Sequence, residues 1–231
     1  MRNRIGSSGF LLWLVRHGQS RSNAGERTSY PAQIALTPLG QEQAAHLASA
    51  FEEAPDLIVT SPYLRARQTA EPLRHRFSAV TDETWPVHEF TYLDSSRCSN
   101  TSPIERRPMV EEYWRRNDPY HVDGENAESY AELIGRADEM WERLAEECVG
   151  KRVVMVSHAG FIQAAIWSRL YSGQKVSAEG MKHFRHFMIC MPMANGAILK
   201  VRDDGEWWCG PIQTANTLMD VGSTPRRRLA T

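Results

Sequence analysis

The sequence predicts an α/β protein, a three-layer α/β/α sandwich with a mostly parallel sheet. Three short apolar runs, at residues 10–15, 56–60 and 152–157, have the length and composition of strands buried on both faces of a parallel sheet. Each run precedes a segment with helical periodicity, and strands that alternate with helices are typical of a sheet covered on both faces. The 231 residues suit one domain, so we expect a single domain over residues 1–231.

Charge and composition exclude several classes of protein. The formal net charge of -1 provides no extended positive field, so we expect no nucleic-acid or membrane partner, and any anion site must be local. The N-terminal apolar run is too short for a signal peptide, and no stretch approaches the roughly 20 apolar residues of a membrane span. We therefore expect a soluble, cytoplasmic protein, either a monomer or a homodimer. The cysteines are widely separated and are interpreted as reduced core thiols: Cys98, Cys148, Cys190 and Cys209.

The first two strand and helix pairs have clear boundaries. Residues 10–15, FLLWLV, form the first predicted strand. The helix after it begins with Thr37 as N-cap, a proline at its first position and apolar residues at helical spacing. The strand at residues 56–60 leads into a second helix with Ser61 as its predicted N-cap. Pro72 is expected to break or kink this helix.

The middle of the chain contains a less regular insertion. Residues 82–93 alternate only weakly and contain a proline, which predicts a short edge strand running into a loop. Residues 94–124 are rich in Arg, Pro, Ser and Asp, and we predict an inserted cap with one helix from Ile104 to Arg116. A long helix should follow from about Ala127 to Cys148, because its apolar residues keep the i, i+3, i+4, i+7 spacing of a core-facing stripe.

The last third of the chain begins with its clearest strand, RVVMVS at residues 152–157, followed by a glycine-containing turn and an apolar helix. Two shorter strands are predicted at residues 187–191 and 197–201, joined through a segment with an Asn-Gly turn signal. The final residues, 222–231, carry a basic run without apolar periodicity and are predicted to be a solvated, disordered tail.

Groups suited to an anion follow each of the three strong strands. Arg16 and His17 follow the first, Arg65 lies in the first turn of the helix after the second, and His158 follows the third. Ligands of open α/β sheets bind beyond the carboxyl ends of the strands. If these strands are neighbours, two guanidinium and two imidazole groups therefore converge on one pocket. A phosphoryl group fits it, because it carries about two negative charges and its oxygens suit bidentate contacts with arginine.

These residue types suit phosphoryl transfer. The arginines would hold the phosphoryl oxygens and neutralise their charge while one neutral imidazole attacks phosphorus. The leaving oxygen needs a proton donor, because an alkoxide is a poor leaving group. Glu89, just past the weak strand, is the preferred candidate, and Glu71 and Glu83 are less favoured alternatives.

Four segments carry a resemblance to a known family: LVRHGQSRSN, LTPLGQEQA, SPYLRARQTAE and VSHAG, in this order. The chain resembles the histidine phosphatase superfamily, also called the phosphoglycerate mutase-like family, over roughly residues 11–200. The resemblance implies the α/β/α sandwich, a phosphohistidine intermediate on His17, Glu89 as proton donor and no metal or other cofactor. It also implies a phosphate pocket of four side chains: Arg16, Asn23, Arg65 and His158.

Each of these residues also has an ordinary structural interpretation. Asn23 could stabilise a turn, Arg65 could lie on a helix surface, and Glu89 could be an exposed carboxylate. Either histidine alone is more often structural than catalytic. The ordered set of motifs at strand ends, rather than any single match, favours the catalytic interpretation.

The family contains phosphatases and cofactor-dependent mutases. The mutases usually carry an Arg-His-Tyr-Gly type segment soon after the proton-donor glutamate, whereas this chain has EFTYLDSSRCSNTSP at residues 89–103. We therefore predict a phosphatase acting on phosphomonoesters of a small phosphorylated metabolite. A phosphoglycerate mutase is the alternative, and a non-catalytic phospholigand-binding relative is a third hypothesis. Substrate choice is expected to depend on residues 94–124.

Overall fold

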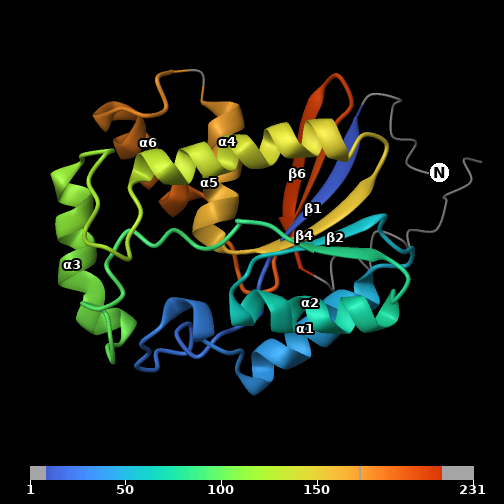
Figure 1. Ribbon diagram of the computed structural model, residues 1–231, viewed down its shortest axis with the longest axis horizontal. Coiled ribbons are helices and arrows are strands. Elements are labelled where there is room, and N and C mark those ends of the chain that lie inside the picture. Colours follow the sequence, from blue (N-terminus) through green and yellow to red (C-terminus); the bar gives the residue numbers. More distant parts are fainter. Residues whose placement is uncertain (1–8, 172, 215–231) are drawn as a thin grey trace, which may run out of the picture.

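A six-stranded sheet lies at the centre of the computed structural model, which describes residues 9–171 and 173–214 (Figure 1). The strand order is β3-β2-β4-β1-β5-β6. The first four strands in this order are parallel, and β5 and β6 are antiparallel to their neighbours, so the predicted mostly parallel sheet is confirmed. The strands are β1 (Phe10–Arg16), β2 (Leu57–Thr60), β3 (Thr81–Thr84), β4 (Arg152–Ser157), β5 (Ile198–Asp203) and β6 (Trp207–Gln213).

Helices cover both faces of the sheet, which confirms the predicted three layers. In Figure 1, α1 and α2 lie on one face, α4 and α5 lie on the other, and α3 lies apart from the sheet at the left of the view. α6 packs beside α5. The helices are α1 (Pro38–Ala50), α2 (Leu64–Arg76), α3 (Pro103–Arg116), α4 (Tyr130–Glu147), α5 (Ala159–Leu170) and α6 (Ala178–Cys190), with a short 3-10 turn at Pro31–Gln33.

The central strands are apolar throughout because both of their faces are buried. In β4, Val153 and Met155 pack in the cluster that includes α4 and α5, whereas Val154 and Val156 pack in the cluster of α1 and α2. Successive side chains of a strand point to opposite faces, so a strand between two helical layers needs apolar residues at every position. This is the physical basis of the continuous apolar runs in the sequence.

Side-chain caps mark the starts of α1, α3 and α4. The Thr37 side chain accepts a hydrogen bond from the Gly40 amide at 3.1 Å, as predicted for the N-cap of α1. α3 and α4 both begin with capping boxes, in which Ser102 and Ser129 exchange hydrogen bonds with the glutamates three residues later. The predicted cap helix and the long amphipathic helix are confirmed as α3 and α4, and β3 lies at the sheet edge as expected.

The predicted start of α2 was wrong, and the helix does not break at Pro72. The helix begins at Leu64, and its N-cap is Tyr63, which makes no side-chain capping bond. Ser61 lies upstream, and its hydroxyl contacts His158 instead. Pro72 lies inside α2, which continues unbroken to Arg76. The cost of the proline is offset by burial of the apolar face of α2 against the sheet.

Residues 187–191 were wrongly predicted as a strand. All but the last belong to α6, in which Met181, Phe184, Phe187 and Met188 continue one apolar stripe at helical spacing. A short apolar run does not by itself distinguish a strand from a buried helix end. The edge strand β6 was not predicted, because its sequence contains a glycine and a proline and alternates weakly.

The cysteine prediction was correct only in part. All four cysteines are free, but Cys190 is exposed and Cys209 is half-buried, so only Cys98 and Cys148 are core thiols. Within residues 9–171 and 173–214, none of the helices has both the length and the apolar character needed to span a membrane. The predicted tail at residues 222–231 lies outside the described residues.

Candidate active site

The three strands that end in charged or titratable groups are neighbours. β4 pairs in parallel with β1 on one side and with β2 on the other, and Arg16 lies in register with Ser157. The residues that follow these strands therefore share one edge of the sheet. The rings of His17 and His158 lie 4.9 Å apart between centroids and are inclined by 60°.

His17 is buried, and its two ring nitrogens have different partners. Nδ1 lies 2.6 Å from the Gly18 carbonyl oxygen, and Nε2 accepts a hydrogen bond from Arg65 Nε at 3.0 Å. A carbonyl can only accept and a guanidinium can only donate, so these contacts assign the proton to Nδ1 and the lone pair to Nε2. Burial, and then the charge of Arg65, lower the pKa of His17 well below its usual value, which keeps the ring neutral.

Arg65 is held in place from several sides. Its guanidinium donates to the Pro31 carbonyl at 2.7 Å and lies over the Tyr63 ring, 5.0 Å from the centroid. Thr69, one turn later in α2, donates to the Arg65 carbonyl at 2.7 Å and accepts from the Gly18 amide at 3.0 Å. α2 and the turn after β1 are thereby tied together, which fixes the guanidinium against the imidazole.

Arg16 and His158 leave two buried nitrogens without partners. Arg16 donates through one terminal nitrogen to the Met193 carbonyl, but its Nε has no hydrogen-bond partner in the described part of the chain, and neither has His158 Nδ1. Buried polar atoms in native proteins are normally paired, so unpaired ones in the same cluster indicate where a ligand with acceptor oxygens binds. Burial lowers the pKa of Arg16, and the charge of Glu89 opposes this effect.

Ser61 orients His158. Its hydroxyl lies 2.8 Å from His158 Nε2 and also accepts from the Tyr63 amide at 3.3 Å. A hydroxyl that already accepts can donate its own proton to Nε2, which favours the His158 tautomer with an N–H at Nδ1. Burial first, and then the charges of Arg65 and His17, lower the pKa of His158 well below its usual value. The fully buried ring can thus donate to an anion while uncharged.

Glu89 reaches the same cluster from the segment after β3. Its Oε1 accepts from the Phe90 amide at 3.0 Å and lies beside Gly160, where a Cβ would approach it to 2.5 Å. Gly160 is in the first turn of α5, so its lack of a side chain makes room for the carboxylate. Burial lowers the pKa of both Arg16 and Arg65, and the negative charge of Glu89 opposes this lowering, as expected for a carboxylate near two guanidinium groups.

The two alternative carboxylates lie elsewhere. Glu71 is exposed on α2. Glu83 forms an ion pair with Arg143 at 2.9 Å and accepts from the Trp85 indole at 2.8 Å. These contacts hold the Glu83 side chain at the outer edge of the sheet.

Asn23 is exposed beside the cluster and uses its carbonyl oxygen within the loop. Its Oδ1 accepts from the Ser20 amide at 3.2 Å, the Ser20 hydroxyl at 3.0 Å and the Asn195 amide at 2.9 Å. Asn195 also donates to the His17 carbonyl at 3.3 Å, which ties the loop before β5 to the turn after β1. Asn23 thus stabilises this turn, and its Nδ2 is the atom that remains for a phosphate contact.

From the sequence, Ser61 was assigned to helix capping and Asn195 was given no role, so neither was predicted as a member of this cluster. A signal for Ser61 exists, because Ser61 directly follows β2 just as His158 follows β4. Residues at equivalent positions after adjacent parallel strands lie close together at one edge. The Asn-Gly pair at residues 195–196 was interpreted as a hairpin turn, which gave no indication that Asn195 contacts the turn after β1.

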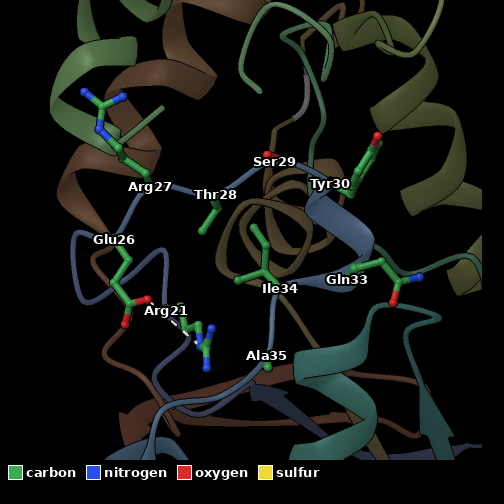
Figure 2. Close-up of a pocket in the computed structure, with 9 residues that line it drawn as sticks. All are labelled: Arg21, Glu26, Arg27, Thr28, Ser29, Tyr30, Gln33, Ile34 and Ala35. Carbon is green, nitrogen blue, oxygen red and sulfur yellow. Dashed lines mark ion pairs between the residues drawn. The ribbon is translucent and has the colours of Figure 1, made fainter. Parts of the chain in front are cut away.

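A pocket of about 270 Å³ lies on the loop that follows β1 (Figure 2). The same loop contains Pro31, whose carbonyl accepts a hydrogen bond from Arg65. The loop also touches the cap through an ion pair between Arg27 and Glu105. The pocket is lined by Arg21, Glu26, Arg27, Thr28, Ser29, Tyr30, Gln33, Ile34 and Ala35.

Among the residues that the structure describes, no three His, Cys, Asp or Glu side chains are grouped to hold a metal ion.

Acid should destabilise the folded protein. The pKa values of His17 and His158 are lowered well below 6.5 and that of His88 to about 4, so below about pH 6.5 the unfolded chain binds protons that the folded chain does not. The free energy of unfolding is therefore highest above pH 6.5. As the pH falls below 6.5, it decreases by about 1.4 kcal/mol per pH unit for each histidine that is protonated only in the unfolded chain.

Urea unfolding between pH 8 and 5 measures this effect. We expect the free energy of unfolding to be nearly flat above pH 7 and to fall between pH 6.5 and 5. His17→Asn should reduce this slope, whereas replacement of the exposed His46 with glutamine should not. A wild-type curve that stays flat to pH 5 would contradict the assignment of neutral buried rings.

Comparison with known proteins gives one family. The model of the histidine phosphatase superfamily, branch 1, matches residues 12–202. The adenosylcobalamin/alpha-ribazole phosphatase of Escherichia coli K12 is 28% identical over 180 residues, which cover 75% of this chain and 84% of that protein. A protein of Yersinia enterocolitica described as a "probable phosphoglycerate mutase" is 29% identical over 154 residues, which cover 64% and 68%.

A solved structure has the same fold. The phosphoserine phosphatase of Entamoeba histolytica, crystallised as a variant with phosphoserine, matches with a TM-score of 0.65 and 20% identity. The match covers 89% of this chain and 98% of that chain.

Proposed function

Because the chain belongs to the histidine phosphatase superfamily, branch 1, we propose that it hydrolyses phosphomonoesters of a small phosphorylated metabolite through a phosphohistidine on His17. The observation that carries this proposal is the state of His17. Its Nε2 lone pair is held beside Arg65, in a cluster with two unpaired buried nitrogens of Arg16 and His158. A neutral nucleophile surrounded by donors is what an incoming phosphoryl group requires.

In the first step, Nε2 of His17 attacks phosphorus, and the bond from phosphorus to the ester oxygen breaks. Arg16, Arg65 and His158 bind the three equatorial oxygens, where negative charge is greatest in the transition state. Glu89 in its protonated form gives its proton to the departing oxygen, so the product leaves as an alcohol. Asn23 contributes a further contact through Nδ2.

In the second step, water attacks the phosphohistidine. Glu89, now a carboxylate, accepts a proton from the water as its oxygen bonds to phosphorus. The electron pair of the P–N bond returns to Nε2, and inorganic phosphate leaves. Both steps use the same donors, and neither requires a metal ion.

A phosphatase is favoured over the mutase alternative. The phosphatase relative matches over more of both chains (75% and 84%) than the probable mutase (64% and 68%). The segment after Glu89 also lacks the Arg-His-Tyr-Gly type sequence usual in the mutases. We place substrate selection in the cap, residues 94–124, which contacts the loop after β1.

Hydrolysis of p-nitrophenyl phosphate in excess EDTA tests this proposal. We expect the purified protein to release nitrophenolate without added metal, because the described groups supply nucleophile, charge stabilisation and proton donor. The same preparation should show little interconversion of phosphoglycerates when 2,3-bisphosphoglycerate is added. The reverse pattern would assign a mutase, and inactivity in both assays would favour a phospholigand-binding protein.

A further inference from the structure

The segment that carries Glu89 lies in neither a helix nor a strand, yet its backbone is bound on both sides of that residue. The Ser157 hydroxyl donates to the Val87 carbonyl at 2.6 Å. Further contacts to its backbone come from one ion pair, between Arg136 and Glu128. By contrast, the only hydrogen bond that the described residues give the Glu89 carboxylate comes from its own neighbour, Phe90. The backbone path therefore decides where the carboxylate lies.

Arg136 of α4 holds the part of the segment before Glu89. One terminal nitrogen donates to the carbonyls of Pro86 and His88, at 2.7 and 3.2 Å. The other terminal nitrogen and Nε donate to the two carboxylate oxygens of Glu128, at 2.7 and 3.0 Å. The guanidinium also lies 4.9 Å from the centroid of the Phe161 ring. Such a planar, fully engaged guanidinium has a defined position.

Glu128 holds the part after Glu89. Its Oε1 accepts from the Thr91 amide at 3.0 Å, and its own amide donates to the Thr91 carbonyl at 3.0 Å. The Arg136 and Glu128 side chains are only 14% and 12% exposed, so the pair is shielded from water. The two residues thus hold the backbone at His88, directly before Glu89, and at Thr91, two residues after it.

We propose that the Arg136–Glu128 ion pair is a positioning unit for Glu89 and controls protonation of the leaving group. The inference rests on the proposed function, in which Glu89 is the proton donor. A general acid must lie within hydrogen-bond reach of the departing oxygen, and a displacement of about 1 Å costs up to roughly 100-fold in rate. A buried ion pair adds little net stability over apolar residues, so stability alone is a weak reason for this pair.

The leaving-group dependence of the rate tests this inference. We expect Arg136→Gln to slow hydrolysis of an alkyl phosphate, such as glycerol phosphate, about 10- to 100-fold more than hydrolysis of p-nitrophenyl phosphate. Nitrophenolate leaves without a proton, whereas an alkoxide does not. Glu128→Gln should shift the ratio of the two kcat/KM values in the same direction. Because both rates come from one preparation, the ratio does not depend on the folded fraction.

Arg143 provides a matched control on the same helix. It lies two turns after Arg136, stacks 4.0 Å from the Trp85 ring centroid and pairs with Glu83, but it does not hold the backbone beside Glu89. Arg143→Gln should leave the ratio within about twofold of wild type, as expected for a residue remote from the proton transfer. The inference would be overturned if Arg136→Gln left the ratio of the two kcat/KM values unchanged, whether both rates fell equally or neither fell.

A double variant separates this inference from the proposed function. If Arg136 acts through Glu89, adding Arg136→Gln to Glu89→Gln should shift the ratio no further. A shifted ratio in Glu89→Gln together with an unchanged ratio in Arg136→Gln would overturn the positioning role alone. An unchanged ratio in Glu89→Gln would remove the proposed proton donor and the inference with it.

Discussion

Replacement of His17 with alanine is expected to lower kcat for p-nitrophenyl phosphate by at least about 10⁴-fold, the scale at which loss of a catalytic nucleophile is felt in other hydrolases. The reason is geometric. His17 Nε2 holds its lone pair beside Arg65, whereas the His158 nitrogen without a partner in the described part of the chain is Nδ1, which carries a proton and can donate but not attack. Steady-state kinetics measures the loss, and rapid quenching in base should trap a phosphohistidine in the wild type but not in the variant.

Binding of inorganic phosphate provides the control for His17→Ala. Arg16, Arg65 and His158 remain in the variant, so its affinity for phosphate, measured by calorimetry, should change by less than about tenfold, as expected when most of the contacts survive. An inactive variant that still binds phosphate has lost the nucleophile and kept the pocket. A variant with wild-type turnover, or a phosphoenzyme that persists without His17, would contradict the assignment.

The parts of the fold that the sequence predicted well have local causes. The strands of the parallel core are buried on both faces, which makes every position apolar and the runs easy to recognise. Thr37 with Pro38 marks the start of α1 through a contact within four residues. The capping boxes that start α3 and α4 are equally local signals, but the prediction of these helices did not use them. The carboxyl ends of β1 and β4 carry Arg16, His17 and His158. The sequence therefore located the edge of the sheet at which the candidate site lies, although it did not give the geometry of the site.

The parts that the sequence did not predict depend on contacts between distant segments. Ser61 has the composition of a helix cap, but adjacency of β2 and β4 brings it to His158, 97 residues later. The Arg136–Glu128 pair holds a loop 37 to 50 residues earlier in the chain. Such pairings follow from strand order and helix docking, which local propensity does not encode.

Ambiguous periodicity explains the misassigned elements near the C-terminus. Residues 187–191 are apolar over a length that fits either a strand or the last turn of a helix, and packing of Met181 and Phe184 against the core decides for α6. β6 lies at the sheet edge, where one side of the strand is unpaired and partly exposed. Edge strands carry a weaker apolar pattern for that reason.

Glu89→Gln is expected to separate substrates by their leaving groups. Loss of general acid catalysis should slow hydrolysis of an alkyl phosphate by about 10²- to 10⁴-fold, because the alkoxide then leaves without a proton. Hydrolysis of p-nitrophenyl phosphate should fall much less in its phosphorylation step, since nitrophenolate needs little protonation. Single-turnover kinetics with both substrates measures this step directly and avoids the later attack of water, which also uses Glu89.

The geometry around Glu89 supplies an independent variant for the same test. Gly160→Ala would place a Cβ 2.5 Å from the present position of Glu89 Oε1, so the carboxylate must move while its chemistry is kept. We expect this variant to shift the leaving-group dependence in the direction of Glu89→Gln. Glu71→Gln, on the exposed face of α2, should leave it unchanged. Equal slowing of both substrates in Glu89→Gln would show that the carboxylate acts in some way other than by protonating the leaving oxygen. Protonation of the leaving group would then have to come from another donor near His17 and His158.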